Sequence, residues 1–425
     1  MVWCEFTIRF VTPAFLDDPP ARSGGLPPMG AQYVPFPVAS LRGALRYWLR
    51  ALVGAHLGNN LAQLAAVEAA VFGAAAGREG APSPVLLRAR SRIPLTNRRP
   101  DWLQSSTGQR ETPRDRVNLQ YLLGLGLWDK GQLSRRYTPE GTTVDLAVKN
   151  CGTPACAQLF LASLWALRTY GGLGARTRRG LGTIEVATPP QLTGDFTTDW
   201  QTSGIDDLHS VIEQVGTAVR ALCPEASGVS GLPLYPAFVD GHFDHSDDQL
   251  DGAQNVGDAL STAGHELRQH RLDGDQRTQE YTSVVAPYLN DGQATAAPFG
   301  IGAFGLPVNF SDPWGPELGG SDRAGKPKRG RRSAIVEPVR AGTGVRRASP
   351  LSLRVYTTGS SWRLRSLALI AEWLPADATL RIEEKTGARG TAYRRQRPGP
   401  VTKPSQADIG RELRGWFEGR RPDPV

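Results

Sequence analysis

The order of strand and helix patterns in the first 190 residues limits the fold of this chain more than any other feature of the sequence. Alternating apolar and polar residues predict strands, and apolar residues recurring at helical spacing predict helices. The predicted strands are 6–10, 85–90, 144–148 and 182–186, and the predicted helices are 41–53 and 154–170. Strand, helix, strand, strand, helix, strand is the order of the split βαβ unit. The sequence therefore predicts an α+β, ferredoxin-like N-terminal domain, the architecture of RNA recognition motifs.

The connection between the second helix and the fourth strand, residues 170–182, has an unusual composition. Its sequence, YGGLGARTRRGLG, contains five glycines and three arginines and no carboxylate. Glycine permits positive φ values and a close approach to the backbone, and guanidinium groups match the geometry of phosphate oxygens. The segment is either a phosphate-binding loop or a solvated turn whose arginines only add solubility. Many glycines beside clustered positive charge favour the phosphate-binding loop.

The first predicted helix carries a second cluster of positive charge. Ser40 is its expected N-cap, and Leu41, Leu45, Trp48, Leu49 and Leu52 form its apolar stripe. Arginines at four-residue spacing on the other side repel one another by a few tenths of a kcal/mol per pair. These arginines are Arg42, Arg46 and Arg50. An anion lying along them would relieve the repulsion, although a solvated basic face is the common alternative.

Length and charge give the domain count and the class of partner. A chain of 425 residues exceeds the usual size of one hydrophobic core, so two domains are expected, at 1–190 and 205–425. A net charge of +8 and the absence of an apolar run long enough to span a bilayer favour a nucleic acid over a membrane as partner. Four cysteines and no secretory signal predict a reducing, cytoplasmic location.

The rest of the chain is expected to add one insertion and a second α+β domain. Residues 94–139 are polar and rich in arginine, which predicts an insertion on the first domain with a short helix at 116–123. Predicted elements of the second domain are helices at 205–222, 253–272 and 407–417 and extended segments at 232–239, 304–310, 351–355, 364–371 and 379–383. A basic tract at 321–332 is expected to be a flexible loop within this domain.

Sequence signals for catalysis, cofactors and metals are weak. The chain has no P-loop, dinucleotide-binding fingerprint, HExxH or paired CxxC motif. Cys151 and Cys156 could be zinc ligands or ordinary buried thiols, and the latter is favoured because the other two cysteines are remote. The segment 240–248, DGHFDHSDD, could bind a cation or be an acidic loop tip. We expect no catalytic residue, no cofactor and no metal site.

Five segments together resemble a known family. They are LRGALRYWLRAL at 41–52, VFG at 71–73, GGLGARTRRGLG at 171–182, FGLPVNF at 304–310 and RRASPLSLRV at 346–355. The glycine-arginine segment alone resembles the RAMP superfamily. With the other four, the chain resembles the RAMP-superfamily first subunits of Cmr effector complexes, which belong to type III-B CRISPR-Cas systems. The resemblance covers residues 1 to about 385, but the insertion near 97–136 departs from it.

The resemblance implies two tandem ferredoxin-like domains in a non-catalytic, RNA-binding subunit that serves antiviral defence. Such a subunit lies at the end of the complex near the 3′ part of the CRISPR RNA and helps to capture target RNA. The implied partners are CRISPR RNA, target RNA and the backbone, small and terminal RAMP subunits. The residues expected to bind RNA are Arg42, Arg46, Arg50, Gly171, Gly172, Gly174, Arg176, Thr177, Arg178, Arg179 and Gly180.

Two other functions stay open. A metal-independent endoribonuclease that processes CRISPR RNA needs a general acid and base, for which His56 and Tyr47 are the nearby candidates in the first domain. A scaffold subunit would instead use its arginines to bind acidic neighbours. Cleavage of repeat-containing RNA would indicate the enzyme, and retention of intact RNA would indicate the RNA binder. Neither cleavage nor retention would indicate the scaffold.

Overall fold

Contacts within the computed structural model divide the chain into two compact units. The first comprises residues up to Arg268 together with Leu351–Ala371, and the second comprises Gln269–Pro350 and Glu372–Gly419. The structure describes residues 2–16, 32–74, 80–98, 100, 113–124, 126–129, 132–192, 196–198, 200, 205–225, 231–273, 281–291, 298–312, 317–321, 327–329, 332–386 and 394–418. No helix in these ranges is long and apolar enough to cross a membrane.

A four-stranded sheet organises the first unit. Its strands are β1 (Cys4–Phe10), β3 (Val85–Ala89), β7 (Thr143–Asn150) and β8 (Ile184–Thr188), in the order β3-β7-β1-β8 with antiparallel pairing throughout. Phe6, Ile8 and Phe10 are fully buried, as the alternation in the sequence predicts. Strand β1, the first in the chain, lies inside the sheet and pairs with β8, the last in the chain, at the edge. A split βαβ unit requires this pairing.

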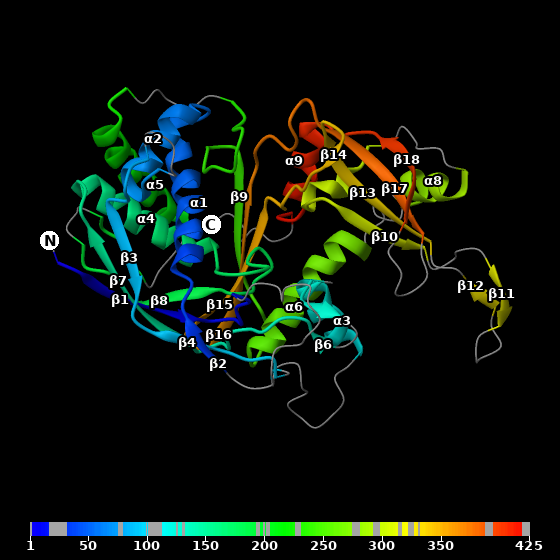
Figure 1. Ribbon diagram of the computed structural model, residues 1–425, viewed down its shortest axis with the longest axis horizontal. Helices are drawn as coiled ribbons and strands as arrows, with labels where there is room; N and C mark the ends of the chain where they lie inside the picture. Colours follow the sequence, from blue (N-terminus) through cyan, green and yellow to red (C-terminus); the bar gives the residue numbers. More distant parts are fainter. Residues whose placement is uncertain are drawn as a thin grey trace. The chain divides into compact units, whose positions relative to one another are not determined.

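Helices cover one face of this sheet. They are α1 (Val38–Leu57), α2 (Leu61–Phe72), α4 (Pro154–Tyr170) and α5 (Ile205–Leu222), which lie together on one side of it in Figure 1. Pro154 at the start and Gly171 at the C-cap of α4 agree with the sequence prediction. The N-cap prediction for Ser40 was wrong: α1 begins at Val38, and the Ser40 N–H already donates to the Pro37 carbonyl inside the first turn.

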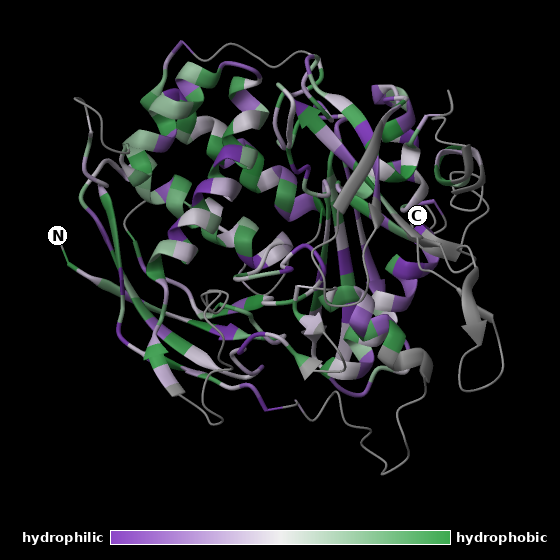
Figure 2. Cartoon of the chain, turned by 45° about the vertical axis from the view of Figure 1, so that its right-hand side comes forward, coloured by the Kyte–Doolittle hydropathy of each residue, from purple (hydrophilic) through white to green (hydrophobic). Residues whose placement is uncertain are grey.

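Helix α2 was not predicted from the sequence. Its N-cap Asn60 accepts a hydrogen bond from the Gln63 N–H, and Leu64, Val67 and Val71 form the buried stripe. Figure 2 shows green, hydrophobic residues beside purple, hydrophilic ones around the helices of this unit, and the buried members form one continuous core. The abundance of alanine in α2 hid the period, because alanine tolerates either a buried or an exposed position.

The described part of the insertion at 94–139 contains helix α3 (Pro113–Leu123) and short paired strands. Helix α3 contains the segment predicted at 116–123. Strand β4 (Arg92–Leu95) pairs with β2 (Gln32–Pro35), and β5 (Trp128–Asp129) pairs with β6 (Gln132–Leu133). Helix α3 packs on α6 (Val256–Arg268), and only glycine fits at Gly264, because a Cβ there would lie 2.6 Å from the Asn118 carbonyl oxygen.

Contacts do not divide the chain at the linker expected between residues 190 and 205. Helix α5 follows that linker and packs against α1 and α4 of the first unit. A three-stranded sheet in the order β15-β16-β9 also belongs to this unit, with β9 (Phe243–Gln249), β15 (Leu351–Thr358) and β16 (Ser361–Leu369). The proposed division into domains at 1–190 and 205–425 stays a prediction.

The second unit is built on a separate antiparallel sheet. Its strands β10 (Val308–Asp312), β13 (Arg332–Arg340), β17 (Thr379–Thr386) and β18 (Arg394–Val401) pair in that order, with β14 (Thr343–Gly344) beside β13. It also holds β11 (Glu317–Ser321), β12 (Pro327–Arg329), α8 (Ala286–Asp291) and α9 (Gln406–Gly415). Much of the basic tract, residues 322–326 and 330–331, lies outside the described residues. Because the strands after residue 205 form separate sheets, a second ferredoxin-like domain is still a prediction.

Candidate nucleic-acid interface

The backbone of the glycine-arginine loop, residues 170–182, packs closely against other backbone segments of the chain. Gly174, Gly180 and Gly182 have φ values of 100°, 80° and 67°, so the prediction of positive φ at the glycines is confirmed at these three positions. A Cβ on Gly182 would lie 2.0 Å from the Leu173 carbonyl oxygen, and one on Gly174 would lie 2.5 Å from the Phe15 carbonyl oxygen. At these glycines the groups that approach closely are, in part, backbone carbonyls of the same chain.

Hydrogen bonds fix the loop to strands from distant parts of the sequence. The Ala175 N–H donates to the Phe15 carbonyl (2.9 Å), just after β1. On the other side the Gly180 N–H donates to the Leu353 carbonyl (2.9 Å) of β15, and the Leu353 N–H donates to the Arg178 carbonyl (3.2 Å). The segments 171–182 and 346–355, both part of the family resemblance, thus meet in space. The loop is therefore hydrogen-bonded to the rest of the first unit on both sides.

Two of the three loop arginines bind the end of helix α3. Arg179 Nη1 donates to the carbonyls of Tyr121 (2.7 Å) and Leu122 (3.3 Å), and Arg176 Nε donates to the carbonyl of Leu123 (3.1 Å). The last carbonyls of a helix have no partner within it, and positive charge near them is favourable. Arg176 itself has a φ of 64°, which is uncommon for a residue with a side chain. These two arginines therefore have structural partners.

The third loop arginine, Arg178, differs from its neighbours. Its guanidinium lies 5.4 Å from the centre of the Tyr47 ring on α1, a cation–π arrangement. Within the described ranges, this guanidinium makes no hydrogen bond and no ion pair. It is half-buried, so it is held in place yet accessible. An arginine in this state can accept a phosphate without giving up a protein partner.

A cavity of about 340 Å³ opens between the loop and helix α1. Its walls are Phe15, Leu16, Ser40, Ala44, Arg135, Gly172, Leu173, Gly174, Ala175 and Thr177. None of these residues carries a carboxylate, and the N–H groups of Gly174 and Thr177 donate to nothing in the described part of the chain. Such N–H groups beside an arginine suit an anion. The cavity is large enough for a single nucleotide-sized group.

The expected RNA-binding residues divide according to this cavity. Gly172, Gly174 and Thr177 line it, whereas Gly171 packs against Trp48 and Gly180 packs against Val355. Sequence reasoning missed the lining residues Ser40, Ala44 and Arg135. Arg135 was visible as one of several arginines in the insertion, but nothing in the sequence distinguished it from the others.

The arginines of helix α1 have an anionic partner within the chain. Arg46 donates to the carbonyls of Phe72 (2.7 Å) and Gly73 (2.8 Å) at the end of α2. Glu68 of α2 lies 3.5 Å from Arg46 Nη1 and 3.2 Å from Arg50 Nε. The anion that the four-residue spacing predicts is therefore present, and for these two arginines it is a glutamate. The Nε atom of Arg42 is buried without a hydrogen-bond partner.

The α1 arginines and the loop cavity lie on different flanks of α1. Successive residues of a helix turn by about 100°, so Ser40, Ala44 and Tyr47 share one flank. That flank faces the cavity and Arg178. Arg42, Arg46 and Arg50 lie beyond the buried stripe of Leu41, Leu45 and Leu49, on the flank that faces α2. On that flank Arg46 and Arg50 are paired with Glu68 of α2, and their assignment as RNA contacts stays a prediction.

The candidate acid and base of an endoribonuclease are not paired. The His56 Nε2 atom lies 2.7 Å from the Ile212 carbonyl oxygen, and burial against α5 lowers the pKa of this histidine. Tyr47 is nine residues earlier on α1, which corresponds to about 13 Å along the helix axis. Tyr47 also lies on the flank that faces Arg178, away from α5. No step of acid–base catalysis can be built from these two side chains in this arrangement.

The acidic segment at 240–248 is used for structure. Asp247 accepts hydrogen bonds from Tyr356, Arg363 (2.8 Å) and Arg365, the last of which is almost fully buried. Burial raises the pKa of Asp247, but Arg365 and the hydrogen bonds outweigh this effect and lower it. Across the described residues, no three His, Cys, Asp or Glu side chains are grouped to hold a metal ion.

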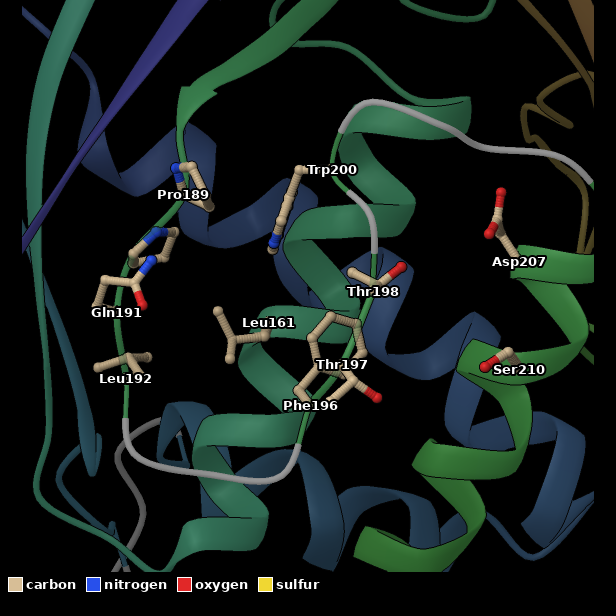
Figure 3. A pocket seen from close by; sticks show the side chains of 11 residues that line it. Leu161, Pro189, Gln191, Leu192, Phe196, Thr197, Thr198, Trp200, Asp207 and Ser210 are labelled. Atoms are coloured by element: carbon tan, nitrogen blue, oxygen red, sulfur yellow. The ribbon is translucent and has the colours of Figure 1, made fainter.

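A second and larger cavity, of about 730 Å³, lies beside α4 and α5. Figure 3 shows Trp200 and Phe196 on one side of it, Gln191 and Leu192 on the other, and Asp207 near its edge. Its described lining residues include this carboxylate and no lysine or arginine. Size alone would favour this cavity, but its charge does not suit a polyanion. The smaller cavity beside the loop is the better candidate for RNA.

Comparisons with known proteins support the resemblance found in the sequence. Residues 28–185 match the family model of the RAMP superfamily. Two curated proteins of Pyrococcus furiosus are similar: CRISPR system Cmr subunit Cmr1-1 is 25% identical over 178 residues, 41% of this chain and 48% of that protein, and Cmr1-2 is 26% identical over 195 residues, 43% of this chain and 93% of that protein. The chain thus matches about half the length of the first relative.

A solved structure extends the likeness over the whole fold. The crystal structure of Cmr1 from Pyrococcus furiosus in its apo form aligns with 93% of this chain and 94% of its own chain, with a TM-score of 0.53 and 18% sequence identity. The mixed α and β architecture of this chain is therefore similar to that of Cmr1. The suspected resemblance to RAMP-superfamily Cmr subunits is confirmed.

Proposed function

We propose that this chain, which matches the RAMP superfamily over residues 28–185, is a non-catalytic, RNA-binding subunit of a Cmr effector complex. The likeness to Cmr1 proteins supports membership of the complex. Its partners would be CRISPR RNA, target RNA and the other Cmr subunits, in the cytoplasm. In this proposal it caps the end near the 3′ part of the CRISPR RNA and helps to capture target RNA, with two tandem ferredoxin-like domains as its framework.

One observation carries the RNA-binding part of this proposal. The cavity beside the loop has no carboxylate in its walls, and beside it stands Arg178, whose guanidinium lies over Tyr47 without an ion-pair partner in the described residues. The N–H groups of Gly174 and Thr177 add neutral donors to this positive site. A phosphate of single-stranded RNA would bind both kinds of donor at once.

The open face of the sheet supports a backbone contact over base stacking. Outward side chains of β1 are Glu5, Thr7 and Arg9, and Arg9 is paired with Glu185 at 2.6 Å. Nucleic-acid-binding sheets usually present aromatic rings to bases. The proposed contact is therefore mainly electrostatic and tolerant of sequence.

The direct test measures RNA affinity by fluorescence anisotropy with a labelled single-stranded RNA. Arg178→Ala should weaken binding about tenfold, as expected for one charge-assisted contact. Arg9→Ala removes the same charge on the outward face of the sheet, so it is the matched control and should change affinity much less. Equal losses in both variants would mean that only net charge matters and would contradict the assigned site.

Incubation with repeat-containing RNA separates the proposed function from its alternatives. We expect RNA to be retained intact. Cleavage that is lost in a Tyr47→Phe variant would support the endoribonuclease instead. Absence of any binding at low salt, with assembly into the complex preserved, would support the scaffold.

A further inference from the structure

The insertion at 94–139 is attached to the glycine-arginine loop at the end of helix α3. Besides its bond to Leu123, Arg176 lies over the turn that follows the helix. A Cβ on Gly124 would come within 2.9 Å of Arg176 Nη2, and one on Gly126 would come within 3.5 Å. Gly124 has a φ of 63°, the left-handed conformation that commonly ends a helix. The guanidinium thus lies against a turn whose left-handed residue is Gly124.

This turn leads directly to a wall of the RNA cavity. Ser134 donates its N–H to the Leu127 carbonyl (3.0 Å) and its Oγ–H to the Gly126 carbonyl (3.0 Å), which closes the small hairpin of β5 and β6 onto the turn. The next residue is Arg135, which lines the cavity. Ser134 is therefore the immediate neighbour of a cavity-lining residue.

The chain is also fixed on the other side of Arg135. Tyr137 exchanges backbone hydrogen bonds with Thr96, both at 2.9 Å, and its ring lies 5.9 Å from that of Phe15. The Thr138 N–H donates to the Ala14 carbonyl at 2.8 Å. Arg135 is therefore held between two anchored points, one on the loop side and one on the strand side of the cavity.

We propose that residues 132–139, the described end of the insertion, form part of the RNA site, with Arg135 as an RNA contact and with Arg176 and Arg179 as positioning residues that hold the end of α3 in place. This inference rests on the proposed function and refines it. The two arginines donate to carbonyls at the end of α3, so their charge stabilises that helix end. Arg135 in the cavity wall and Arg178, which follows the lining residue Thr177, then both offer positive charge to one phosphate-bearing strand.

The proposal makes different demands on the four arginines. Arg178→Ala and Arg135→Ala should each lower RNA affinity about tenfold. Arg178→Ala should also leave the melting temperature nearly unchanged, because its guanidinium makes no hydrogen bond or ion pair in the described residues. Arg176→Ala should lower both the melting temperature and RNA affinity, because α3 and the turn lose a partner. Arg179→Lys should retain the affinity better than Arg179→Ala, since a lysine can still donate to the Tyr121 carbonyl.

A double-variant cycle in the full-length chain is the decisive experiment. In the Arg135→Ala background, Arg176→Ala should still lower the melting temperature but should change RNA affinity less than about twofold, because the contact that it positions is already gone. Ser134→Ala offers a gentler probe of the same path and should behave in the same direction. Both affinities are measured with the same labelled single-stranded RNA.

The possible outcomes distinguish the inference from the proposed function. Effects of Arg176→Ala and Arg135→Ala that multiply fully would show that Arg176 contacts RNA itself, and would overturn its positioning role. A loss of affinity in Arg178→Ala with none in Arg135→Ala would remove the insertion from the site and leave the proposed function standing. No loss in any of the four variants would contradict the proposed function as well.

Discussion

Helix α1 and the glycine-arginine loop each carry a set of three arginines. The two sets look alike in the sequence, but their surroundings in the structure differ. In both sets, arginine side chains donate to backbone carbonyls at the end of a neighbouring helix: Arg46 to α2, and Arg176 and Arg179 to α3. In both, one arginine lacks an ion-pair partner in the described residues, namely Arg42 and Arg178. The difference is Glu68, which neutralises part of the α1 set and has no counterpart among the residues lining the loop cavity.

This difference shows that clustered arginine is a poor predictor of a binding site when it is taken alone. A guanidinium has five N–H donors and can satisfy carbonyls, a carboxylate and a ligand from one position. What separates the two sets is a cavity without a carboxylate beside Arg178 and a glutamate beside Arg46 and Arg50. The predictions below test whether this separation governs stability and RNA binding.

The largest expected contrast comes from one substitution made in both regions. Gly182→Ala should destabilise the protein by about 3 kcal/mol or more, because a Cβ would lie 2.0 Å from the Leu173 carbonyl oxygen at a φ of 67°. Gly43→Ala on α1 has no atom within 4 Å of the new Cβ and should stabilise by about 0.5–1 kcal/mol. Urea denaturation of both variants measures the two effects. Similar effects of the two changes would mean that the loop is not the tightly packed element described above.

Acid should act more strongly on the loop side than on α1. Burial, with a contribution from Arg365, lowers the pKa of His245 to about 4, and its ring contacts Tyr170 at the start of the loop. Because the unfolded chain binds this proton near pH 6.5, stability should fall as the pH drops from about 6.5 toward 4, by about 2 kcal/mol between pH 7 and pH 5. His56 at the end of α1 has a pKa lowered by burial and contributes in the same direction.

Histidine variants assign this acid sensitivity to its source. His245→Asn should flatten the dependence of unfolding free energy on pH more than His56→Asn does. His209→Asn, on the exposed face of α5, is the matched control and should leave the dependence unchanged. A pH profile that is identical in all three variants would show that neither buried histidine is responsible.

Arg46→Gln tests the structural role of the α1 set. Without a partner anion, this change would stabilise the helix by about a few tenths of a kcal/mol, because it removes two like-charge neighbours. The structure reverses the sign: the carbonyls of Phe72 and Gly73 lose a charged donor, so we expect destabilisation by about 1 kcal/mol. Thermal and urea unfolding decide between the two signs. An increase in stability would show that repulsion outweighs these hydrogen bonds.

The smallest effect concerns Arg42, which the sequence predicted as an RNA contact and which lies on the flank of α1 away from the loop cavity. If four to six phosphates are neutralised, log affinity for single-stranded RNA should fall with log salt at a slope of about −3 to −4, and each lost contact should reduce the slope by about 0.7. We expect Arg178→Ala to show that reduction. Arg42→Ala should weaken binding only about twofold, through the general field of the protein. A full reduction of the slope in Arg42→Ala would extend the RNA site to the α1 set.

Much of the first unit could be predicted from the sequence because burial has a local period. Phe6, Ile8 and Phe10 alternate with polar residues along β1, and the apolar residues of α1 recur at a spacing of three and four. Each pattern therefore predicts the conformation of its own segment. The left-handed glycines of the loop were predictable for the same local reason. Helix α2 was missed because its alanines make the apolar stripe hard to recognise. Residues 351–371 pack in the first unit although they are distant in sequence, and no local pattern predicts such a contact.

The sequence by itself determined the four strands of the first sheet, helices α1 and α4, the positive charge and the motifs of the family resemblance. Only the tertiary structure showed which arginines are bound to groups of the chain itself. Arg46, Arg176 and Arg179 are satisfied by the carbonyls of Phe72, Leu123 and Tyr121. Every residue carries the same carbonyl group, so a bond from a side chain to the backbone leaves no signature in the partner's identity. The guanidinium of Arg178, in contrast, makes no hydrogen bond or ion pair with any carbonyl or carboxylate of the described residues.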